Sequence, residues 1–379
     1  PAASTPTQNV HRRCAYVEMH CVWWKVQGGS TFPDCKTREE HGCFVDCFFR
    51  RMTYSLGMSK ISRSTFTVVA LAGVWVPFHS AFAGSGSTVE LSEIARLYSM
   101  RMQMVSNKIV LKNRYNTLEI EENGRRAWIN DVMFWLHEPC RRSGRTWAIR
   151  KADFQYGIDP VLRSYTHAPK RTPMVVVIDP GHGGKDSGAV GLKKVFEKQL
   201  VLDISYRMKN LLESHGFKVV MTRSGDQYPS LDDRVDLARK VKADLFLSIH
   251  ADGAASSAAH GVETFITTAA GFDSSNHYGK GGDRSSVLNN RYDAANAMLG
   301  YAVQSNLLKM SGRSDRGVRR ARFAVIKKAP CPAALVECGF LTNPEEERLL
   351  RTEAYRSRVA QGIVNGVRAY RTLVSRAKR

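Results

Sequence analysis

The stretch MVVVIDPGHGG at residues 174–184 decides the fold of this chain. Its valine-rich apolar run predicts a buried strand, and the glycines after it predict a tight turn. In open α/β sheets, turns at the carboxyl ends of strands carry the residues that do the chemistry. His182 therefore stands where a functional side chain is expected. A single histidine in a glycine-rich turn is more often structural, so the turn alone leaves both interpretations open.

A second histidine follows a strand in the same way. The sequence VKADLFLSIHAD at residues 241–252 is typical of another apolar strand, and His250 stands at its end. Glu197 opens a predicted helix fifteen residues after His182. Catalytic zinc usually has three protein ligands drawn from histidine and carboxylate, with water at the fourth position. His182, Glu197 and His250 together therefore predict a zinc site.

Glu197 also has a simpler interpretation. An acidic residue in the first turn of a helix complements the helix dipole, and this is the usual role of such a residue. The loop at residues 185–196 is long enough, however, to bring Glu197 back over the edge of the sheet. We therefore expect Glu197 to be a metal ligand.

Glu337 ends a third apolar strand, at about residues 333–338. A carboxylate is costly to bury there unless it is paired or used. A general base beside a metal-bound water accounts for it, since zinc acidifies the water and the carboxylate takes the proton. The alternative is an ion pair between Glu337 and one of the arginines that precede it, Arg316, Arg319, Arg320 or Arg322.

Strands and helices alternate after residue 174, which predicts an α/β fold with a mainly parallel twisted sheet flanked by helices. Ser230, three residues before Asp233, favours a capped helix start. We expect strands at 175–178, 217–222, 244–249, 261–266, near 323–326 and at 333–338, and helices at about 197–214, 230–241, 289–310 and 352–371.

Residues 84–166 differ in pattern from the α/β segment and predict a small α+β module. Helical spacing covers residues 91–98, and strand patterns cover 108–111, 118–120, 126–132 and 145–149, with Asn123-Gly124 as a hairpin turn. The order of these strands and turns resembles the copper-amine-oxidase N-terminal-like domains of bacterial envelope proteins. A linker with two prolines, at residues 167–173, leads to the α/β domain, which we place at residues 174–373.

Residues 58–83 have the three parts of a secretory signal peptide. A positive segment follows Met58, an apolar stretch covers residues 66–78, and Ala81-Phe82-Ala83 supplies a cleavage site. The apolar stretch is too short to span a bilayer, and a buried core helix would not explain its flanks. Residues 1–57 show neither helical nor strand periodicity. We interpret them as a doubtful upstream leader that is absent from the mature protein.

The chain carries 56 lysines and arginines against 35 aspartates and glutamates, a net charge of +21. Such an excess suits a polyanionic partner, and nucleic acid, anionic lipid and acidic cell-wall polymers all qualify. No basic block with interleaved aromatic residues stands out, and the export signal disfavours nucleic acid. A hydrophobic content of 43% supports an ordinary folded core.

Five of the eight cysteines belong to the leader, where their spacing with histidines contains no C-x-x-C pair and is a weak sign of a metal knuckle. The other three are Cys140, Cys331 and Cys338. A disulfide between Cys331 and Cys338 is conceivable. The apolar run around Cys338 instead favours a buried thiol there.

The motifs DPGHGG (179–184), SIHAD (248–252) and VECGFLTN (336–343), with Glu197, resemble the zinc-dependent N-acetylmuramoyl-L-alanine amidases of the amidase-3 type. The resemblance covers residues 174–371. It implies that His182, Glu197 and His250 bind zinc (Zn2+) and that Glu337 is the catalytic acid/base. The implied reaction is hydrolysis of the amide that joins the lactyl group of N-acetylmuramic acid to L-alanine in peptidoglycan, by an exported enzyme of the periplasm or cell wall.

Two departures from the family pattern concern Cys338 and the segment 267–288. Cys338 stands where the family commonly has a small or hydroxylated residue, and we expect it only to pack. The segment is short and rich in Gly, Ser and Asp, whereas cell-division members carry a long insertion with a helix that blocks the zinc site. We therefore expect an uninhibited site with no obligatory protein activator, and no membrane insertion after signal cleavage.

Three other functions are weighed against the amidase. A zinc peptidase that cuts within the stem peptide uses the same chemistry and differs in its products. A catalytically silent wall-binding protein would be expected to lack one of the metal ligands or the catalytic glutamate, and all four residues are present. A nucleic-acid-binding protein has only the charge in its favour. The module at residues 84–166 is expected to target the wall.

Overall fold

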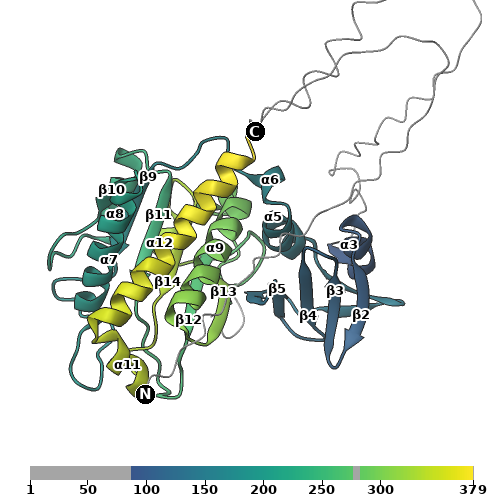
Figure 1. The fold of residues 1–379 in the computed structure, drawn as a ribbon, viewed down its shortest axis with the longest axis horizontal. Coiled ribbons are helices and arrows are strands. Elements are labelled where there is room, and N and C mark those ends of the chain that lie inside the picture. The colour runs from purple at the N-terminus through teal and green to yellow at the C-terminus, as the bar shows by residue number, and fades with distance from the viewer. Residues whose placement is uncertain (1–86, 276–281, 379) are drawn as a thin grey trace, which may run out of the picture. The chain divides into compact units, whose positions relative to one another are not determined.

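The structure is a computed structural model that describes residues 87–275 and 282–378 (Figure 1). These residues belong to one compact unit. The predicted leader at 1–57 and signal peptide at 58–83 lie outside the described residues. Across residues 87–275 and 282–378, none of the helices combines the length and apolar character that a membrane span requires.

The chain after residue 174 folds around a twisted sheet. Its strands are β9 (Val175–Pro180), β10 (Lys218–Met221), β11 (Leu245–His250), β12 (Val262–Thr267), β13 (Asp315–Ala321) and β14 (Ala333–Glu337), in the order β10-β9-β11-β14-β12-β13. The first four strands of that order are mutually parallel, whereas β12 runs antiparallel to β14 and parallel to β13. The predicted α/β fold is confirmed, with a sheet that is mixed at β12.

Helices cover both faces of this sheet. They are α7 (Glu197–Ser214), α8 (Leu231–Lys240), α9 (Asp293–Ser311), α10 (Ala324–Lys327), α11 (Pro344–Leu350) and α12 (Glu353–Arg376). Figure 1 shows α7, α12 and α9 side by side across one face. Successive residues of a strand point to opposite faces of the sheet. Val176 and Leu247 accordingly pack in one core cluster. Val177 and Phe246 pack in a second cluster, together with residues of α8 and α10.

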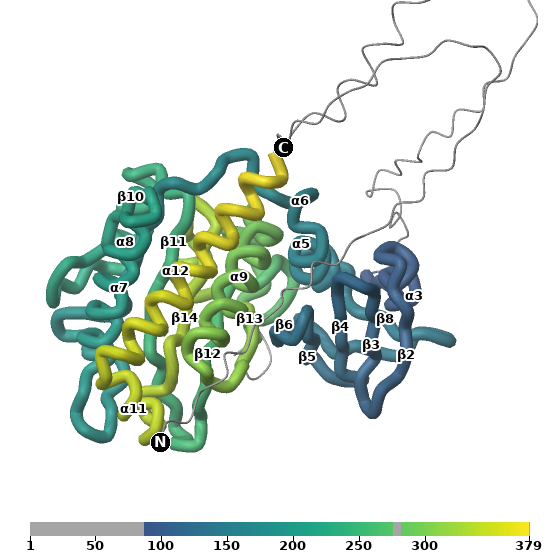
Figure 2. Tube along the Cα trace, viewed as in Figure 1, coloured from purple at the N-terminus to yellow at the C-terminus, as the bar shows by residue number. Residues whose placement is uncertain are grey.

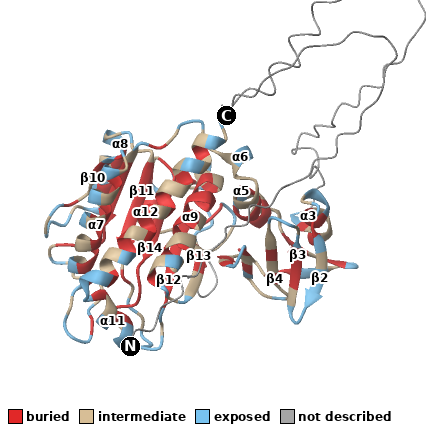
Figure 3. Cartoon of the chain, viewed as in Figure 1, coloured by how far each residue is buried: buried red, intermediate tan, exposed pale blue. Residues whose placement is uncertain are grey.

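Burial on both faces explains why the central strands are almost continuously apolar. Figure 3 shows β14 buried along its length and β11 buried up to its last residue, with the helices exposed only on their outer sides. Ser230 accepts a hydrogen bond from the backbone nitrogen of Asp233 at 3.1 Å, as expected for the start of α8.

The predicted strand near residues 323–326 is wrong. Those residues begin the short helix α10, and the strand lies earlier, at Asp315–Ala321. Its sequence DRGVRRA has no apolar alternation, because arginines occupy strand positions where they find buried or half-buried partners. The apolar FAVI run resembles a strand in sequence because a short buried helix has the same composition.

The preceding residues form an α+β segment, in which the predicted helix and strands are accompanied by strands at 88–90, 101–105 and 141–143 that were not predicted. The elements of this segment are β1 (Thr88–Glu90), α3 (Leu91–Leu97), β2 (Arg101–Val105), β3 (Lys108–Lys112), β4 (Thr117–Glu121), β5 (Arg126–Ile129), β6 (Val132–Trp135), β7 (Arg141–Ser143) and β8 (Thr146–Arg150). Strands β2 to β6 form an antiparallel meander, and β1, β8 and β7 form a separate sheet. The predicted strand at 126–132 is two strands, since Asn130 and Asp131 have positive φ angles of 47° and 67° and make a hairpin turn.

The meander continues the main sheet. Phe134 of β6 pairs in parallel with Val318 of β13, so β6 follows β13 in one eleven-stranded sheet. After β8 the chain passes through α4 (Lys151–Asp153), a π-helical turn (Phe154–Ile158), α5 (Asp159–Leu162) and α6 (Ser164–His167) before it enters β9. The tube in Figure 2 follows this path. The domain boundaries at 166 and 174 stay predictions.

Candidate metal centre and active-site cleft

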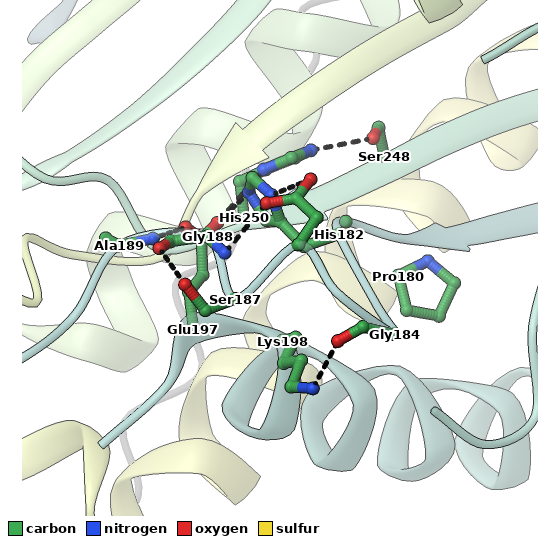
Figure 4. Close-up of polar contacts among 12 residues, drawn as sticks. Pro180, His182, Gly184, Ser187, Gly188, Ala189, Glu197, Lys198, Ser248 and His250 are labelled. Carbon is green, nitrogen blue, oxygen red and sulfur yellow. Dashed lines mark hydrogen bonds and ion pairs between the residues drawn. The ribbon is translucent and has the colours of Figure 1, made fainter. Parts of the chain in front are cut away.

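Three of the predicted site residues converge at the carboxyl edge of the sheet. His182 lies in the turn after β9, Glu197 is the first residue of α7, and His250 is the last residue of β11. One ligand atom from each lies within 4.8 Å of the other two. Glu197 Oε1 is 3.1 Å from His182 Nε2 and 3.0 Å from His250 Nδ1. Figure 4 shows the two imidazole rings facing this carboxylate.

The turn after β9 orients His182 by means of three successive residues with positive φ angles. His182 has φ 62°, and Gly183 and Gly184 that follow have φ 127° and 55°, so the chain needs glycine there. His182 Nδ1 is 2.9 Å from Asp186 Oδ2. The other carboxylate oxygen of Asp186 accepts a hydrogen bond from the Gly188 backbone at 3.1 Å. Asp186 thus orients the ring. It is not among the residues predicted from the sequence, although an acid four residues after a turn histidine is a usable signal.

The loop before α7 turns the Glu197 carboxylate inward. The side chain is buried, and it accepts hydrogen bonds from the backbone nitrogens of Ala189 at 2.8 Å and Ala251 at 3.0 Å. Figure 4 shows Glu197 and Ala189 close together. Glu197 therefore faces the histidines, in addition to standing at the positive end of its helix.

A series of hydrogen-bonded polar side chains fixes the orientation of the His250 ring. Its Nε2 is 3.2 Å from Ser248 Oγ, and Ser248 donates to Asp179 Oδ2 at 2.8 Å. Asp179 is fixed in turn by Arg234 Nη1 at 2.8 Å and by Thr222 Oγ1 at 2.6 Å. Because Ser248 uses its proton on Asp179, its oxygen accepts from His250 Nε2. The lone pair of His250 Nδ1 then faces Glu197.

The charges of the cluster favour a cation among the three residues. Burial would raise the pKa of Glu197, but hydrogen bonds and charge from His182 and His250 lower it well below its usual range. Burial would lower the pKa of His182, but Glu197 and Asp186 outweigh burial and raise it. If His182 donates through Nδ1 to Asp186, its Nε2 lone pair also faces the carboxylate. A proton or a metal ion is needed between such groups.

This donor set fits zinc. Two imidazole nitrogens and one carboxylate oxygen are ligands of catalytic zinc sites. Each histidine has a hydrogen-bond partner on its other nitrogen, which is the usual arrangement around metal-binding histidines.

Glu337 ends β14 beside the cluster, opposite His250 in β11 and Glu263 in β12. It is buried, and its Oε2 has no hydrogen-bond partner within residues 87–275 and 282–378. Burial raises its pKa well above the usual value, with further contributions from Asp252, Glu197 and Glu263. The alternative ion pair is not found in that part of the chain, since Arg316 and Arg319 bind Glu263 instead.

Two hollows adjoin the cluster, and His182, His250, Phe323 and Glu337 line both. One has a volume of about 590 Å³ and is also lined by Glu197, Asp252, Glu263, Arg316 and Arg319. The other has about 250 Å³ and is lined by Tyr228, Leu231 and Arg234. The two hollows therefore share the predicted catalytic and ligand residues.

Cys140, Cys331 and Cys338 are buried free thiols, so the conceivable Cys331–Cys338 disulfide is absent. Burial raises the pKa of the Cys338 thiol well above its usual value. Cys338 belongs to the core cluster that includes Val336 and Tyr355. These contacts agree with the packing role expected for it.

An α/β sheet that gathers two histidines and a glutamate at its edge, beside a buried unpaired glutamate, has the architecture of metal-dependent hydrolases. Comparison with known proteins gives the family. The family model described as N-acetylmuramoyl-L-alanine amidase matches residues 176–369, and the chain belongs to this amidase family.

Individual relatives carry the same name. N-acetylmuramoyl-L-alanine amidase AmiC of Escherichia coli O6:H1 is 38% identical over 226 residues, which cover 54% of this chain and 54% of that protein. AmiA of Escherichia coli K12 is 37% identical over 226 residues, covering 52% of this chain and 75% of that protein. The chain thus spans about half the length of the first relative. The catalytic domain of CwlV from Bacillus (Paenibacillus) polymyxa var. colistinus is 36% identical, covers 52% of this chain and 97% of that chain, and has a TM-score of 0.44.

Proposed function

We propose that this protein hydrolyses the amide bond between N-acetylmuramic acid and the L-alanine of the peptidoglycan stem. The observation that carries the proposal is the convergence of His182, Glu197 and His250 with the unpaired Glu337 in one cleft. We infer which bond is cleaved from the amidase family to which the chain belongs.

His182, Glu197 and His250 would hold the metal, which we propose to be zinc. When bound, zinc supplies a Lewis acid that polarises the amide carbonyl and acidifies water. The chain's own contribution is a rigid ligand set. Asp186 and Ser248 fix the two rings, and the backbone nitrogens of Ala189 and Ala251 fix the carboxylate of Glu197.

Glu337 would move the proton. Its carboxylate takes the proton of the attacking water and delivers it to the leaving amino group of L-alanine. The buried position suits this role, because a carboxyl group whose pKa is raised accepts a proton more readily than an ordinary glutamate. No hydrogen bond within the described ranges engages Oε2, so its lone pairs are available for a proton.

The substitution Glu337→Ala tests this assignment. The variant is expected to keep its zinc, measured by atomic absorption, and to lose at least about a hundredfold in amide cleavage, the size of a general acid–base contribution. Glu345→Ala is the matched control, since this exposed glutamate pairs with Arg313 away from the cleft. Wall hydrolysis at an undiminished rate by Glu337→Ala would refute the role.

We further propose that the mature protein works outside the cytoplasm, at the cell wall, and that residues 84–166 help to hold it there. Its excess of basic residues would retain it on the carboxylates of the stem peptides by a salt-sensitive attraction. We also propose that it needs no activator protein. Residues 276–281 of the segment 267–288 lie outside the described residues, so this rests on the sequence.

A further inference from the structure

Strand β13 has a bulge at Arg316, next to the larger hollow. Asp315 pairs with Val262 and Gly317 pairs with Glu263, so Arg316 is an extra residue without a partner in the ladder. Side chains alternate strictly in a regular strand, and residues three apart point to opposite faces. A bulge resets that alternation. Arg316 and Arg319 consequently reach the same carboxylate.

That carboxylate belongs to Glu263, which is 1% exposed. Its Oε2 accepts from Arg316 Nε at 3.1 Å and from Arg319 Nη1 at 2.8 Å. The single carboxylate of Glu263 is paired with two guanidinium groups, so these three side chains together carry a net positive charge on the lining of the larger hollow. Within residues 87–275 and 282–378, no hydrogen bond engages the terminal nitrogens of Arg316, and Arg319 Nε is buried without a partner. Because Arg319 Nε is inaccessible, the donors left for a ligand are terminal nitrogens, chiefly those of Arg316.

Aromatic rings hold both guanidinium groups in place. Arg316 lies over the ring of Phe340 at 4.4 Å, and Arg319 lies near the rings of Trp135 at 5.0 Å and Phe265 at 5.6 Å. Stacked, planar guanidinium groups with fixed orientation are suited to bind a carboxylate.

Strand β6, which pairs with β13, also holds the bulge through hydrogen bonds. Asp315 accepts from the backbone nitrogens of Met133 at 2.7 Å and Gly317 at 2.8 Å. Trp135 Nε1 donates to the carbonyl oxygen of Arg316 at 2.9 Å. Gly317 has φ 89°, and a Cβ there would lie 3.0 Å from the Met133 carbonyl oxygen, so only glycine fits. The meander thus helps to shape the cleft.

We propose that Arg316 and Arg319 form a carboxylate-binding subsite, and that it takes the free α-carboxylate of the second stem residue. This inference rests on the proposed amidase function. The two arginines line the same hollow as His182, Glu197 and Glu337, so a carboxylate close to the cleaved bond is within reach. Because Asp252 and Glu337 also line that hollow, the bound carboxylate must lie against the arginine pair.

The test uses two synthetic N-acetylmuramoyl dipeptides that differ only in whether the α-carboxyl of the second residue is free or amidated. The zinc-loaded protein is expected to cleave the free acid with a kcat/KM about tenfold higher, the size of a hydrogen bond to a charged group. Arg316→Gln is expected to bring that ratio close to one, and Arg316→Lys to restore part of it. Arg313→Gln removes the same charge three residues away, outside the hollow, and is expected to leave the ratio unchanged.

Binding of the two free dipeptides, measured by calorimetry, gives a readout that does not need hydrolysis. Preferential binding of the acid that is lost in Arg316→Gln supports the subsite even if neither muramoyl substrate is cleaved, and such a result would overturn only the amidase proposal. Cleavage of both substrates at equal rates, or an equal loss on both in Arg316→Gln, would overturn the subsite. Equal binding of both dipeptides would overturn it as well.

Discussion

Each histidine of the candidate metal centre has a partner on the ring nitrogen that faces away from Glu197. For His182 that partner is Asp186 at 2.9 Å, and for His250 it is Ser248 at 3.2 Å. These contacts fix which nitrogen carries the proton and which presents a lone pair. The orientation of the ligands is therefore built into the protein before a metal binds.

Asp186→Asn is expected to weaken zinc binding without removing it. Loss of such an orienting carboxylate typically lowers metal affinity by about ten- to a hundredfold. Competition with a chromophoric chelator measures the change. Asp236→Asn, at an exposed carboxylate that pairs with Arg239 on α8, is the control. An unchanged zinc affinity in Asp186→Asn would show that Asp186 does not orient His182.

At the scale of elements, two glycines in the loops at the sheet edge let the backbone pack directly against the ligands. A Cβ on Gly181 would lie 2.3 Å from His250 Cε1, and one on Gly188 would lie 2.5 Å from Glu197 Oε2. Real Cβ atoms do not approach other atoms so closely. The glycines are thus required because two ligands pack directly against the backbone.

Gly181→Ala is expected to displace the His250 ring and to reduce bound zinc and activity together, while β9 still folds. Zinc content and circular dichroism check the two parts. Gly225→Ala is the control, because its Cβ would meet only the flexible side chain of Gln227. A Gly181→Ala protein with full zinc and full activity would contradict the observed packing.

The ligand-bearing elements could be predicted from sequence because each has a local signal. An apolar run ending in His182 or His250, and an acid opening a helix, are visible within a few residues. The strand β13 could not be predicted, since its arginines are accommodated by Glu263 far away in sequence. The bulge at Arg316 depends on pairing with β12 and contacts with β6, which no local pattern reports.

At the scale of the whole molecule, Asp159 connects the segment after β8 to Tyr98, the residue that follows α3. It is fully buried and accepts hydrogen bonds from Arg163 at 2.6 Å, from His167 at 2.6 Å and from the hydroxyl of Tyr98. Burial alone would raise the pKa of Asp159, but His167, Arg163 and Tyr98 lower it to about 2. The carboxylate therefore stabilises the fold in its ionised form.

Because the pKa of Asp159 is lower in the folded state, its ionised carboxylate stabilises the folded protein. This stabilisation is fully present above the unfolded pKa of about 3.9 and is lost as the pH falls toward 2. The two pKa values correspond to roughly 2 to 3 kcal/mol at neutral pH. Asp159→Asn is expected to lower the free energy of urea unfolding at pH 7 by about that amount, and by much less near pH 2.5. A loss of the same size at both pH values would show that charge at Asp159 is irrelevant.

The most direct test of the amidase assignment is mass spectrometry of the fragments that the mature protein releases from purified peptidoglycan, with zinc and with a chelator. We predict stem peptides with free L-alanine amino termini and glycan strands without peptides, formed only when zinc is present. Fragments cut within the stem peptide would show a peptidase. The same products in the presence of the chelator, or no products with zinc, would contradict a zinc amidase centred on His182, Glu197 and His250.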